Sequence, residues 1–308
     1  MKKSVVLLAL ATLALSLQAG EVLSGKAAKA KFPASLRGGL KEAKWTRLMP
    51  GVEYFFGTFT NLYGNAAEDI SVIRVDFKTA PVQMKYIDNR AEKANLRRKT
   101  SDVAKRCDAL FGINATFPDW YSKTDGKVAK DGHKDGGFAF NDDKTFKFFR
   151  RFASINTNDY SNIFATEAYA LDNGTITLGN TFGNAPYTFM GEATNNVLYI
   201  AVADGRTKRS QGLSYHTTMK FLKEFGCFNG MTIDGGGSTT MVIRKDLIPA
   251  DVNEVQYVSE GSPDHYTMNH TVNSSVPGNR ERAVVNQLMF IKSQPKATGQ
   301  KKVEQGWR

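Results

Sequence analysis

Short apolar runs with a period of two constrain the fold of this chain more than any other feature. Apolar residues alternate with polar ones over residues 70–77 and 82–87. This spacing is typical of half-buried β-strands. Further strands are predicted over residues 52–59, 110–117, 197–203, 231–233, 240–243 and 284–291, and a hairpin over 169–178 that turns at Asp172-Asn173-Gly174.

Helical patterns are few. Ser101 can cap a short helix over residues 101–108, and the spacing of Met219, Leu222 and Phe225 predicts an amphipathic helix that ends at Gly226. Many strands and few helices, without a regular βαβ rhythm, favour an α+β fold. We expect a mixed, largely antiparallel sheet core with a few packed helices in a single catalytic domain.

The two ends of the chain differ from its body. A basic start, an apolar run and small residues at Ala19 and Gly20 indicate a signal peptide over residues 1–20. The protein is therefore predicted to be exported, to the periplasm or the cell exterior. Since no later apolar run is long enough to cross a bilayer, we expect no stable membrane insertion. Residues 21–44 are expected to form a flexible leader, 45–292 the domain, and 293–308 a disordered tail.

Charge and cysteine content limit the partners. The net charge of +11 falls to about +5 when the signal peptide and the tail are left out. Because the chain has no clustered basic helix and no RNP-like motif, we expect no nucleic-acid partner. A glycan or sugar-phosphate substrate fits export better.

The two cysteines, Cys107 and Cys227, have two interpretations, a disulfide bond between strands or two buried thiols.

The most informative run is Ile233-Asp234-Gly235-Gly236-Gly237-Ser238-Thr239-Thr240. Three glycines after a strand lose much entropy on ordering, which indicates backbone that approaches a ligand closely or adopts positive φ. Their amides and the following hydroxyls can bind an anion. The run is not a P-loop, since no lysine follows the glycines. An ordinary glycine-rich turn is the alternative interpretation.

Together with its surroundings, this run resembles the phosphodiester glycosidase family, which includes the lysosomal uncovering enzyme N-acetylglucosamine-1-phosphodiester alpha-N-acetylglucosaminidase. Further similar motifs occur in the family's order at residues 112–117, 135–140, 203–206, 212–225 and 279–286. The resemblance covers residues 45–292. It implies a hydrolase that cleaves a sugar-1-phosphodiester or related glycosidic bond in a glycan or cell-envelope polymer.

The resemblance and the chemistry of such a bond suggest roles for individual residues. The leaving phosphate is a weak base, so stabilising its charge matters more than protonating it. We expect Asp234 to act as base or nucleophile, with Asp204 and Glu192 as reserve carboxylates. Substrate contacts are predicted for Asn114, Gly235, Gly236, Gly237, Ser238, Thr239, Arg206, Arg282 and Asn286. Asn114 has an alternative role, that of holding a turn.

Two features depart from the family pattern. Tyr187 stands where the family commonly has an arginine, so the anion site must use Arg206, Arg280 or Arg282, or the substrate differs. Residues 245–280 are interpreted as an inserted lid, from which His265 or His270 could reach the site.

Metal chemistry and simple binding are the competing hypotheses. The four histidines form no metal-ligand pattern, and no metal site or cofactor is expected. A metal-dependent phosphodiesterase would use Asp204 and Asp234 to hold Mg²⁺ or Ca²⁺. A non-catalytic protein would bind anionic glycan through the same glycine run. The sequence leaves open the sugar, the stereochemical outcome and the oligomeric state.

Overall fold

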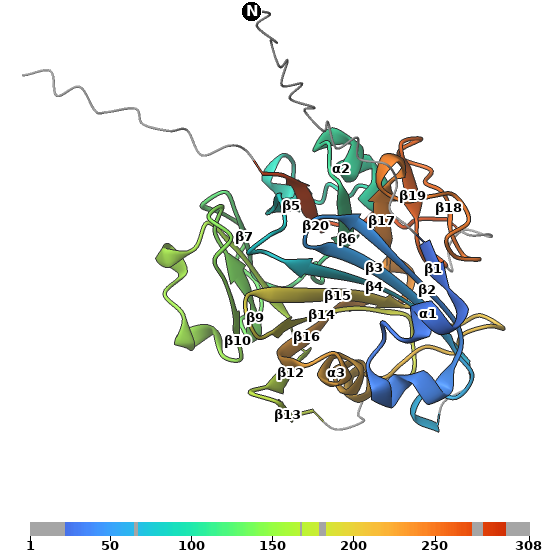
Figure 1. The fold of residues 1–308 in the computed structure, drawn as a ribbon. Coiled ribbons are helices and arrows are strands. Elements are labelled where there is room, and N and C mark those ends of the chain that lie inside the picture. Colours follow the sequence, from blue (N-terminus) through green and yellow to red (C-terminus); the bar gives the residue numbers. More distant parts are fainter. Residues whose placement is uncertain (1–21, 65–66, 167, 179–182, 273–279, 294–308) are drawn as a thin grey trace, which may run out of the picture.

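The computed structural model describes residues 22–64, 67–166, 168–178, 183–272 and 280–293. These residues form three β-sheets with a few helices on their faces (Figure 1). Every pairing between the described strands is antiparallel. The α+β expectation is therefore confirmed. The predicted signal peptide and tail fall on residues outside the described ones, except for residue 293.

The largest sheet has nine strands. In spatial order they are β1 (Val22–Ser24), β2 (Leu40–Met49), β3 (Val52–Phe59), β4 (Glu68–Asp76), β15 (Val197–Ala203), β14 (Tyr187–Ala193), β16 (Cys227–Gly235), β12 (Ala168–Asp172) and β13 (Thr175–Ile176). The predicted hairpin turn joins β12 to β13, where Asn173 and Gly174 both adopt positive φ. Such turns favour these two residue types because the left-handed region costs them little.

Two smaller sheets complete the fold. The six-stranded sheet has the order β18 (Tyr257–Val258), β19 (His265–Thr267), β17 (Met241–Arg244), β6 (Phe111–Asn114), β20 (Asn286–Lys292) and β5 (Val82–Asp88). The five-stranded sheet has the order β10 (Phe146–Phe149), β9 (Gly136–Phe140), β11 (Asn162–Thr166), β7 (Ser122–Thr124) and β8 (Lys127–Lys130).

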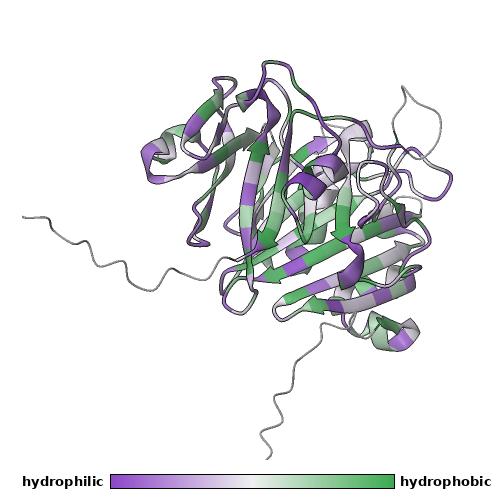
Figure 2. Cartoon of the chain, turned by 90° about the horizontal axis from the view of Figure 1, so that it is seen from above, coloured by the Kyte–Doolittle hydropathy of each residue, from purple (hydrophilic) through white to green (hydrophobic). Residues whose placement is uncertain are grey.

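The main hydrophobic core unites the inward faces of the nine-stranded and six-stranded sheets. Ile73 and Ile233 enter it from the first sheet, and Ile113 and Leu288 from the second. Each of these side chains is almost completely buried. Burial of a side chain of this size stabilises the fold by about 1.5–3 kcal/mol relative to exposure. Figure 2 shows the same pattern as hydrophobic residues that alternate with polar ones along the strands.

Helices cover the outer faces of these two sheets. Helix α3 (Tyr215–Glu224) packs on the nine-stranded sheet, and Ser214 caps it through a capping box with Thr217. Gly226 follows with φ 82, as expected for a residue that ends a helix. Helix α2 (Thr100–Arg106) packs on the six-stranded sheet through Val103. The short α1 (Gly25–Lys29) lies beside β2.

The segment predicted to be a flexible leader is folded where the structure describes it. Residues 22–44 contain β1, α1 and the start of β2. Phe32 is buried and meets Phe55 and Phe225 edge to face, with ring centroids 5.6 and 6.1 Å apart. Large apolar residues are sparse in this segment, but those present are buried in the core on the α3 side of the sheet.

Residues 245–272, predicted to be part of a lid, also pack into the fold. Leu247, Ile248 and Val252 belong to the main core, and β18 and β19 extend the six-stranded sheet. The weak apolar pattern of this segment hides buried residues separated by polar turns. The segment is packed into the domain, and Asn269 in it contacts the glycine run through the Thr239 carbonyl.

Cys107 and Cys227 are both free thiols. Cys107 ends α2 on the six-stranded sheet, whereas Cys227 begins β16 in the nine-stranded sheet. They contact different hydrophobic clusters. Of the two interpretations, the structure has separate, at least partly buried thiols.

Candidate active site

The glycine run carries the chain from one sheet to the other. Strand β16 of the nine-stranded sheet ends at Gly235, a single 3₁₀ turn follows (Gly236–Ser238), and β17 of the six-stranded sheet begins at Met241. Both sheets are held by extensive backbone pairing on either side of this turn. A turn clamped between two sheets has a fixed shape, which suits a site that must hold reacting groups in place.

Asn114 fixes this turn from behind. Its Nδ2 donates to the Asp234 carbonyl at 2.7 Å, while its Oδ1 accepts from the Thr188 hydroxyl at 2.6 Å and the Thr240 amide at 3.1 Å. The side chain is completely buried. Asn114 therefore positions the backbone of Asp234, and the predicted sugar or phosphate contact is not the role that its geometry supports.

The Asp234 carboxyl group lies at the end of β16 and is partly exposed. Burial raises its pKa to about 6, against the opposing effects of a hydrogen bond from Ser238 and the positive charge of Arg282. It is consequently ionised at neutral pH, yet more basic than an ordinary aspartate. These are the properties required of a general base or nucleophile.

The three glycines are required by what surrounds them. A Cβ atom at Gly235 would lie 2.3 Å from the ring of Tyr187, and one at Gly237 would lie 2.6 Å from Nη2 of Arg282. Gly236 has φ 61, in the left-handed region that favours glycine. An aromatic ring and a guanidinium group thus approach the bare backbone of the turn.

Two arginines flank the turn. Nη1 of Arg206 lies 3.3 Å from the position that a Gly236 Cβ would take, next to the contact of Arg282 with Gly237. Arg206 has φ 56, a conformation that non-glycine residues adopt at a cost and that clusters at functional sites. Arg280 is instead exposed and lies 3.8 Å from a carboxylate oxygen of Glu260. Of the three candidate arginines, the structure places Arg206 and Arg282 at the turn.

Tyr187 packs where the family commonly has an arginine. Its ring lies against Gly235 and meets Tyr215 of α3 edge to face, with centroids 4.8 Å apart. The side chain is buried. This position therefore supplies an aromatic wall behind the turn, and the cationic groups come from Arg206 and Arg282.

Asp204 lies behind a histidine. The Asp204 carboxylate is almost completely buried and accepts hydrogen bonds from the backbone amide of His270 at 2.9 Å and from its Nδ1 at 3.1 Å. Burial raises the pKa of Asp204 to about 6, and the hydrogen bond to Asp204 raises the pKa of His270. Asn269 donates to the Thr239 carbonyl at 3.0 Å, which holds His270 beside the turn. The Asp204 carboxylate is thus bonded to His270 by both of its oxygens and lies beneath the surface.

Further acidic residues stand behind Asp204 and have no counterpart among the sequence predictions. Ser210 donates to Glu68 at 2.5 Å, and Arg209 donates to Asp69 at 2.9 Å. Burial raises the pKa of Glu68 to about 7. The only sequence signal was a pair of acidic residues at the start of an apolar strand, Glu68-Asp69.

Glu192 is not part of this site. In the pairing of β14 with β16, Tyr187 lies opposite Gly235 whereas Glu192 lies opposite Asn229. Five residues along a strand separate the two positions by about 16 Å. The prediction of Glu192 as a reserve carboxylate is wrong. The register of β14 with β16, which the sequence does not show, places Glu192 near the end of the strand that lies away from the glycine run.

Thr239 and Asn286 lie beneath the surface. The Thr239 hydroxyl and both amide atoms of Asn286 are buried without a hydrogen-bond partner in the described part of the chain. Leaving a polar group unpaired inside a protein costs about 1–3 kcal/mol. A bound ligand or water could satisfy them, and their roles as substrate contacts stay predictions.

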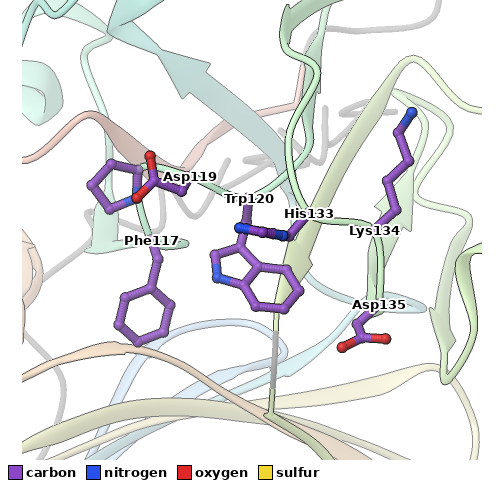
Figure 3. A pocket seen from close by; sticks show the side chains of 7 residues that line it. Phe117, Asp119, Trp120, His133, Lys134 and Asp135 are labelled. Atoms are coloured by element: carbon purple, nitrogen blue, oxygen red, sulfur yellow. The ribbon is translucent and has the colours of Figure 1, made fainter.

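A pocket of about 570 Å³ opens where the chain leaves β6 (Figure 3). The Asp234 amide donates to the Ala115 carbonyl at 3.1 Å, and Phe117, two residues further on, lines this pocket. A smaller pocket shares Pro118 and Asp119 with it and contains Arg97. The charge of Arg97 also lowers the pKa of Asp234. The backbone of Asp234 is thus bonded to the segment that leads into the larger pocket, and a cation of the smaller pocket acts on its carboxyl group.

Among the described residues, no group of three or more His, Cys, Asp or Glu side chains is arranged to hold a metal ion. Within the same residues, no helix is both long and apolar enough to cross a membrane.

Comparison with known proteins gives a consistent result. The catalytic domain of zebrafish N-acetylglucosamine-1-phosphodiester alpha-N-acetylglucosaminidase, auto-inhibited by its pro-peptide, has a similar fold, with a TM-score of 0.59, 16% identity, and coverage of 90% of this chain and 96% of that one. A hypothetical protein from Synechocystis matches with a TM-score of 0.58 and 11% identity over 78% of this chain, but over only 62% of its own length. At these identities the likeness shows the fold alone.

A search of curated protein sequences found no match. A family model described as phosphodiester glycosidase, in contrast, matches residues 100–291. This range contains Asn114, Asp204, Asp234, His270 and Arg282, which together make up most of the candidate site. The chain belongs to the phosphodiester glycosidase family.

Proposed function

We propose that this protein is an exported hydrolase that cleaves a sugar-1-phosphodiester, or a closely related glycosidic bond, in a glycan or cell-envelope polymer. The observation that carries the proposal is the convergence of one basic carboxylate, Asp234, with the guanidinium groups of Arg206 and Arg282 at a single rigid turn. Membership of the phosphodiester glycosidase family supports the same reaction type. The name of the zebrafish relative makes N-acetylglucosamine the first sugar to test.

The reaction places the carboxylate and the cations on opposite sides of one bond. Asp234 either removes a proton from the attacking water or itself attacks the anomeric carbon. The bond between that carbon and the phosphate oxygen breaks, and its electron pair stays on the leaving phosphate monoester. Arg206 and Arg282 neutralise the charge that develops there, with help from the Gly237 and Ser238 amides. When Asp234 is the nucleophile, water hydrolyses the resulting sugar ester in a second step.

His270 supplies a proton donor at the same turn. The adjacent Asp204 raises the pKa of its imidazole, which favours the protonated form. A protonated His270 can donate to a phosphate oxygen or to a departing group. Asp204 is a positioning residue in this scheme, because both of its carboxylate oxygens accept from His270.

The structure bears on both competing hypotheses. A purely binding site would place the Asp234 carboxylate beside bound phosphate, where the like charges repel. A metal-dependent phosphodiesterase would require Asp204 as a ligand, but Asp204 is almost completely buried and bonded to His270. The glycosidase mechanism instead uses Asp204 through its hydrogen bonds to His270.

The proposal is tested by incubating the purified protein with a panel of sugar-1-phosphodiesters, teichoic-type polymers and peptidoglycan. Release of a reducing sugar together with a phosphate monoester supports it. Binding without product would support the binding protein, and activity abolished by EDTA and restored by Mg²⁺ or Ca²⁺ would support the metal enzyme. Export is tested separately, by sequencing the N-terminus of the mature protein from its native compartment.

A further inference from the structure

The pocket beside β6 combines features that the proposed cleavage chemistry does not use. Its lining consists of Phe117, Pro118, Asp119, Trp120, His133, Lys134 and Asp135. Figure 3 shows the rings of Trp120 and His133 lying together, with Phe117 and Asp119 on one side and Asp135 on the other. The ring centroids of Trp120 and His133 are 5.5 Å apart. The pocket thus presents aromatic surface between carboxylates.

The frame of this pocket is rigid. The segments that carry Trp120 and His133 run side by side as a parallel bridge. The His133 amide donates to the Asp119 carbonyl at 2.9 Å, and the Tyr121 amide donates to the His133 carbonyl at 2.9 Å. A Cβ atom at Gly132 would lie 2.1 Å from the Asp119 carbonyl oxygen, so the close approach requires glycine there.

The polar groups of the pocket are available to a ligand. Asp119 and Asp135 are exposed, and no hydrogen bond or ion pair within the described residues engages their carboxylates, although Asp119 lies close enough to Arg90 for their charges to interact. Lys134 is engaged elsewhere, with its ammonium 2.5 Å from Asp131 and over the ring of Tyr121. An ionised carboxylate can accept hydrogen bonds but cannot donate them, and it would repel an anion.

This combination matches the chemistry of a neutral sugar. A pyranose ring has an apolar face of C–H groups that packs on an aromatic ring and an edge of hydroxyl donors that suits carboxylates. The pocket volume of about 570 Å³ lies in the range of small-ligand sites and is larger than a few ordered water molecules would fill. A phosphate group fits less well, since Lys134 already has an acidic partner.

We propose that the pocket lined by Phe117, Trp120, His133, Asp119 and Asp135 is a saccharide subsite, which binds a neutral sugar unit of the substrate next to the reactive linkage. The proposal rests on the proposed function for the reaction at Asp234. It adds that the substrate extends beyond one sugar phosphate. The Asp234 amide donates to the Ala115 carbonyl, two residues before Phe117 in the pocket, so one short segment connects the two sites.

Binding to an inactive form tests the subsite without relying on turnover. The Asp234→Asn protein is titrated with N-acetylglucosamine, with the tetrasaccharides of N-acetylglucosamine and of glucose, and with adenosine monophosphate as a nucleobase probe. We expect at least one tetrasaccharide to bind more tightly than the monosaccharide. Adding Trp120→Ala should weaken that binding by at least about tenfold, whereas Trp120→Phe retains most of it because the aromatic face remains.

Asp119 and Asp135 are both exposed, so substitution of their carboxylates should perturb folding little and provides a second set of variants. Asp119→Asn and Asp135→Asn should each weaken tetrasaccharide binding, while Asp142→Asn, an exposed control in the β9–β10 turn, should not. Equal affinity for monosaccharide and tetrasaccharides, or unchanged binding after both Trp120→Ala and the two Asp substitutions, would overturn the subsite. Tighter binding of adenosine monophosphate through Trp120 would also overturn it, in favour of a nucleobase site.

The two proposals fail in different ways. Tetrasaccharide binding that depends on Trp120, in a wild-type protein that hydrolyses none of the diesters, would keep the subsite and reject the proposed function. Hydrolysis of short diesters without any Trp120-dependent tetrasaccharide binding would keep the function and reject the subsite.

Discussion

Asp234 and Glu192 lie at opposite ends of the paired strands β16 and β14, and burial raises the pKa of both carboxyl groups. Each also accepts one side-chain hydrogen bond, from Ser238 and from Asn229 respectively. Their surroundings differ in charge. The positive charges of Arg282 and Arg97 lower the pKa of Asp234. The pKa of Glu192 is instead set by burial and by the hydrogen bond from Asn229, without a cation. A carboxyl group with a raised pKa therefore indicates a reactive site only where cations or other groups that stabilise developing charge lie beside it.

The largest expected effect is the loss of the Asp234 carboxylate. Asp234→Asn should lower kcat/KM by about 1,000-fold or more, because the amide can neither accept the proton of water nor attack carbon. The measurement is the rate of phosphate monoester release under substrate-limited conditions. Activity within tenfold of the wild-type value would remove Asp234 from the mechanism.

Stability provides the control for this variant. The folded-state pKa of Asp234 is raised to about 6, above its ordinary value of 3.8, so its contribution to stability is greatest below pH 3.8 and is lost as pH rises through about 6. At pH 7 the wild-type protein therefore bears the cost of a partly buried charge. Asp234→Asn removes that charge, and its Tm at pH 7 should not fall.

Removal of a cation from the turn should have the next largest effect. Arg282→Ala is expected to lower kcat by about 100-fold, since it removes a charge that stabilises the departing phosphate. Arg282→Lys should recover only part of the loss, because a point charge does not reproduce the fork of a guanidinium group. A substitution that raises KM alone and leaves kcat unchanged would show that Arg282 binds substrate without stabilising the transition state.

Acidification should titrate Asp234. If the ionised form is required, kcat/KM should fall at least about tenfold for each pH unit below 6, because the raised pKa of Asp234 sets this range and Asp204 titrates in the same range. The profile is measured from pH 4 to 8 with a substrate whose phosphodiester does not titrate there. A rate that is flat between pH 5 and 7 would contradict the assigned base.

Loss of Asp204 should have a smaller effect, which acts through His270. Asp204→Asn keeps the size of the side chain but removes the charge that raises the His270 pKa, and we expect a decrease of about tenfold in kcat/KM at pH 7. The distinguishing readout is the alkaline limb of the pH profile, which should shift to lower pH. A lower rate with an unshifted alkaline limb would assign Asp204 a purely structural role.

The smallest effect belongs to Glu192 and completes the comparison. Glu192→Gln should change kcat/KM by less than about twofold, because the side chain lies at the far end of the strand from the reacting groups. Parallel assays with Asp234→Asn provide the matched pair. A large loss in Glu192→Gln would show that the pKa shift, and not the convergence of charges, identifies the functional carboxylate.

Much of the central architecture could be predicted from sequence because its signals are local. The alternation over residues 70–77 and the capping and glycine signals around α3 depend on neighbours in the chain, and the structure contains β4 and α3 there. Strand β2 escaped prediction, since its apolar residues are interrupted by Lys and Glu and its pairing with β3 contains register shifts. Local pattern is a poor guide where a strand is irregular.

The sequence predicted the glycine run at the centre of the site but not the residues that surround it in the fold. The glycine run identified the turn because glycine there is required by close contacts that no other residue allows. The misassignment of Glu192 and the hidden position of Asp204 had a different cause. Register between β14 and β16 and the approach of His270 depend on chain segments far apart in sequence. Such contacts follow from the folded topology and leave no local pattern.

The position of the cleaved bond tests the central claim most directly. Hydrolysis of a sugar-1-phosphodiester in ¹⁸O-labelled water, followed by mass spectrometry of both products, reports which atom is attacked. Attack at the anomeric carbon, assisted by Asp234 with Arg206 and Arg282 on the leaving phosphate, predicts label in the sugar and none in the phosphate monoester. Label in the phosphate would contradict this account and assign the turn to a phosphodiesterase.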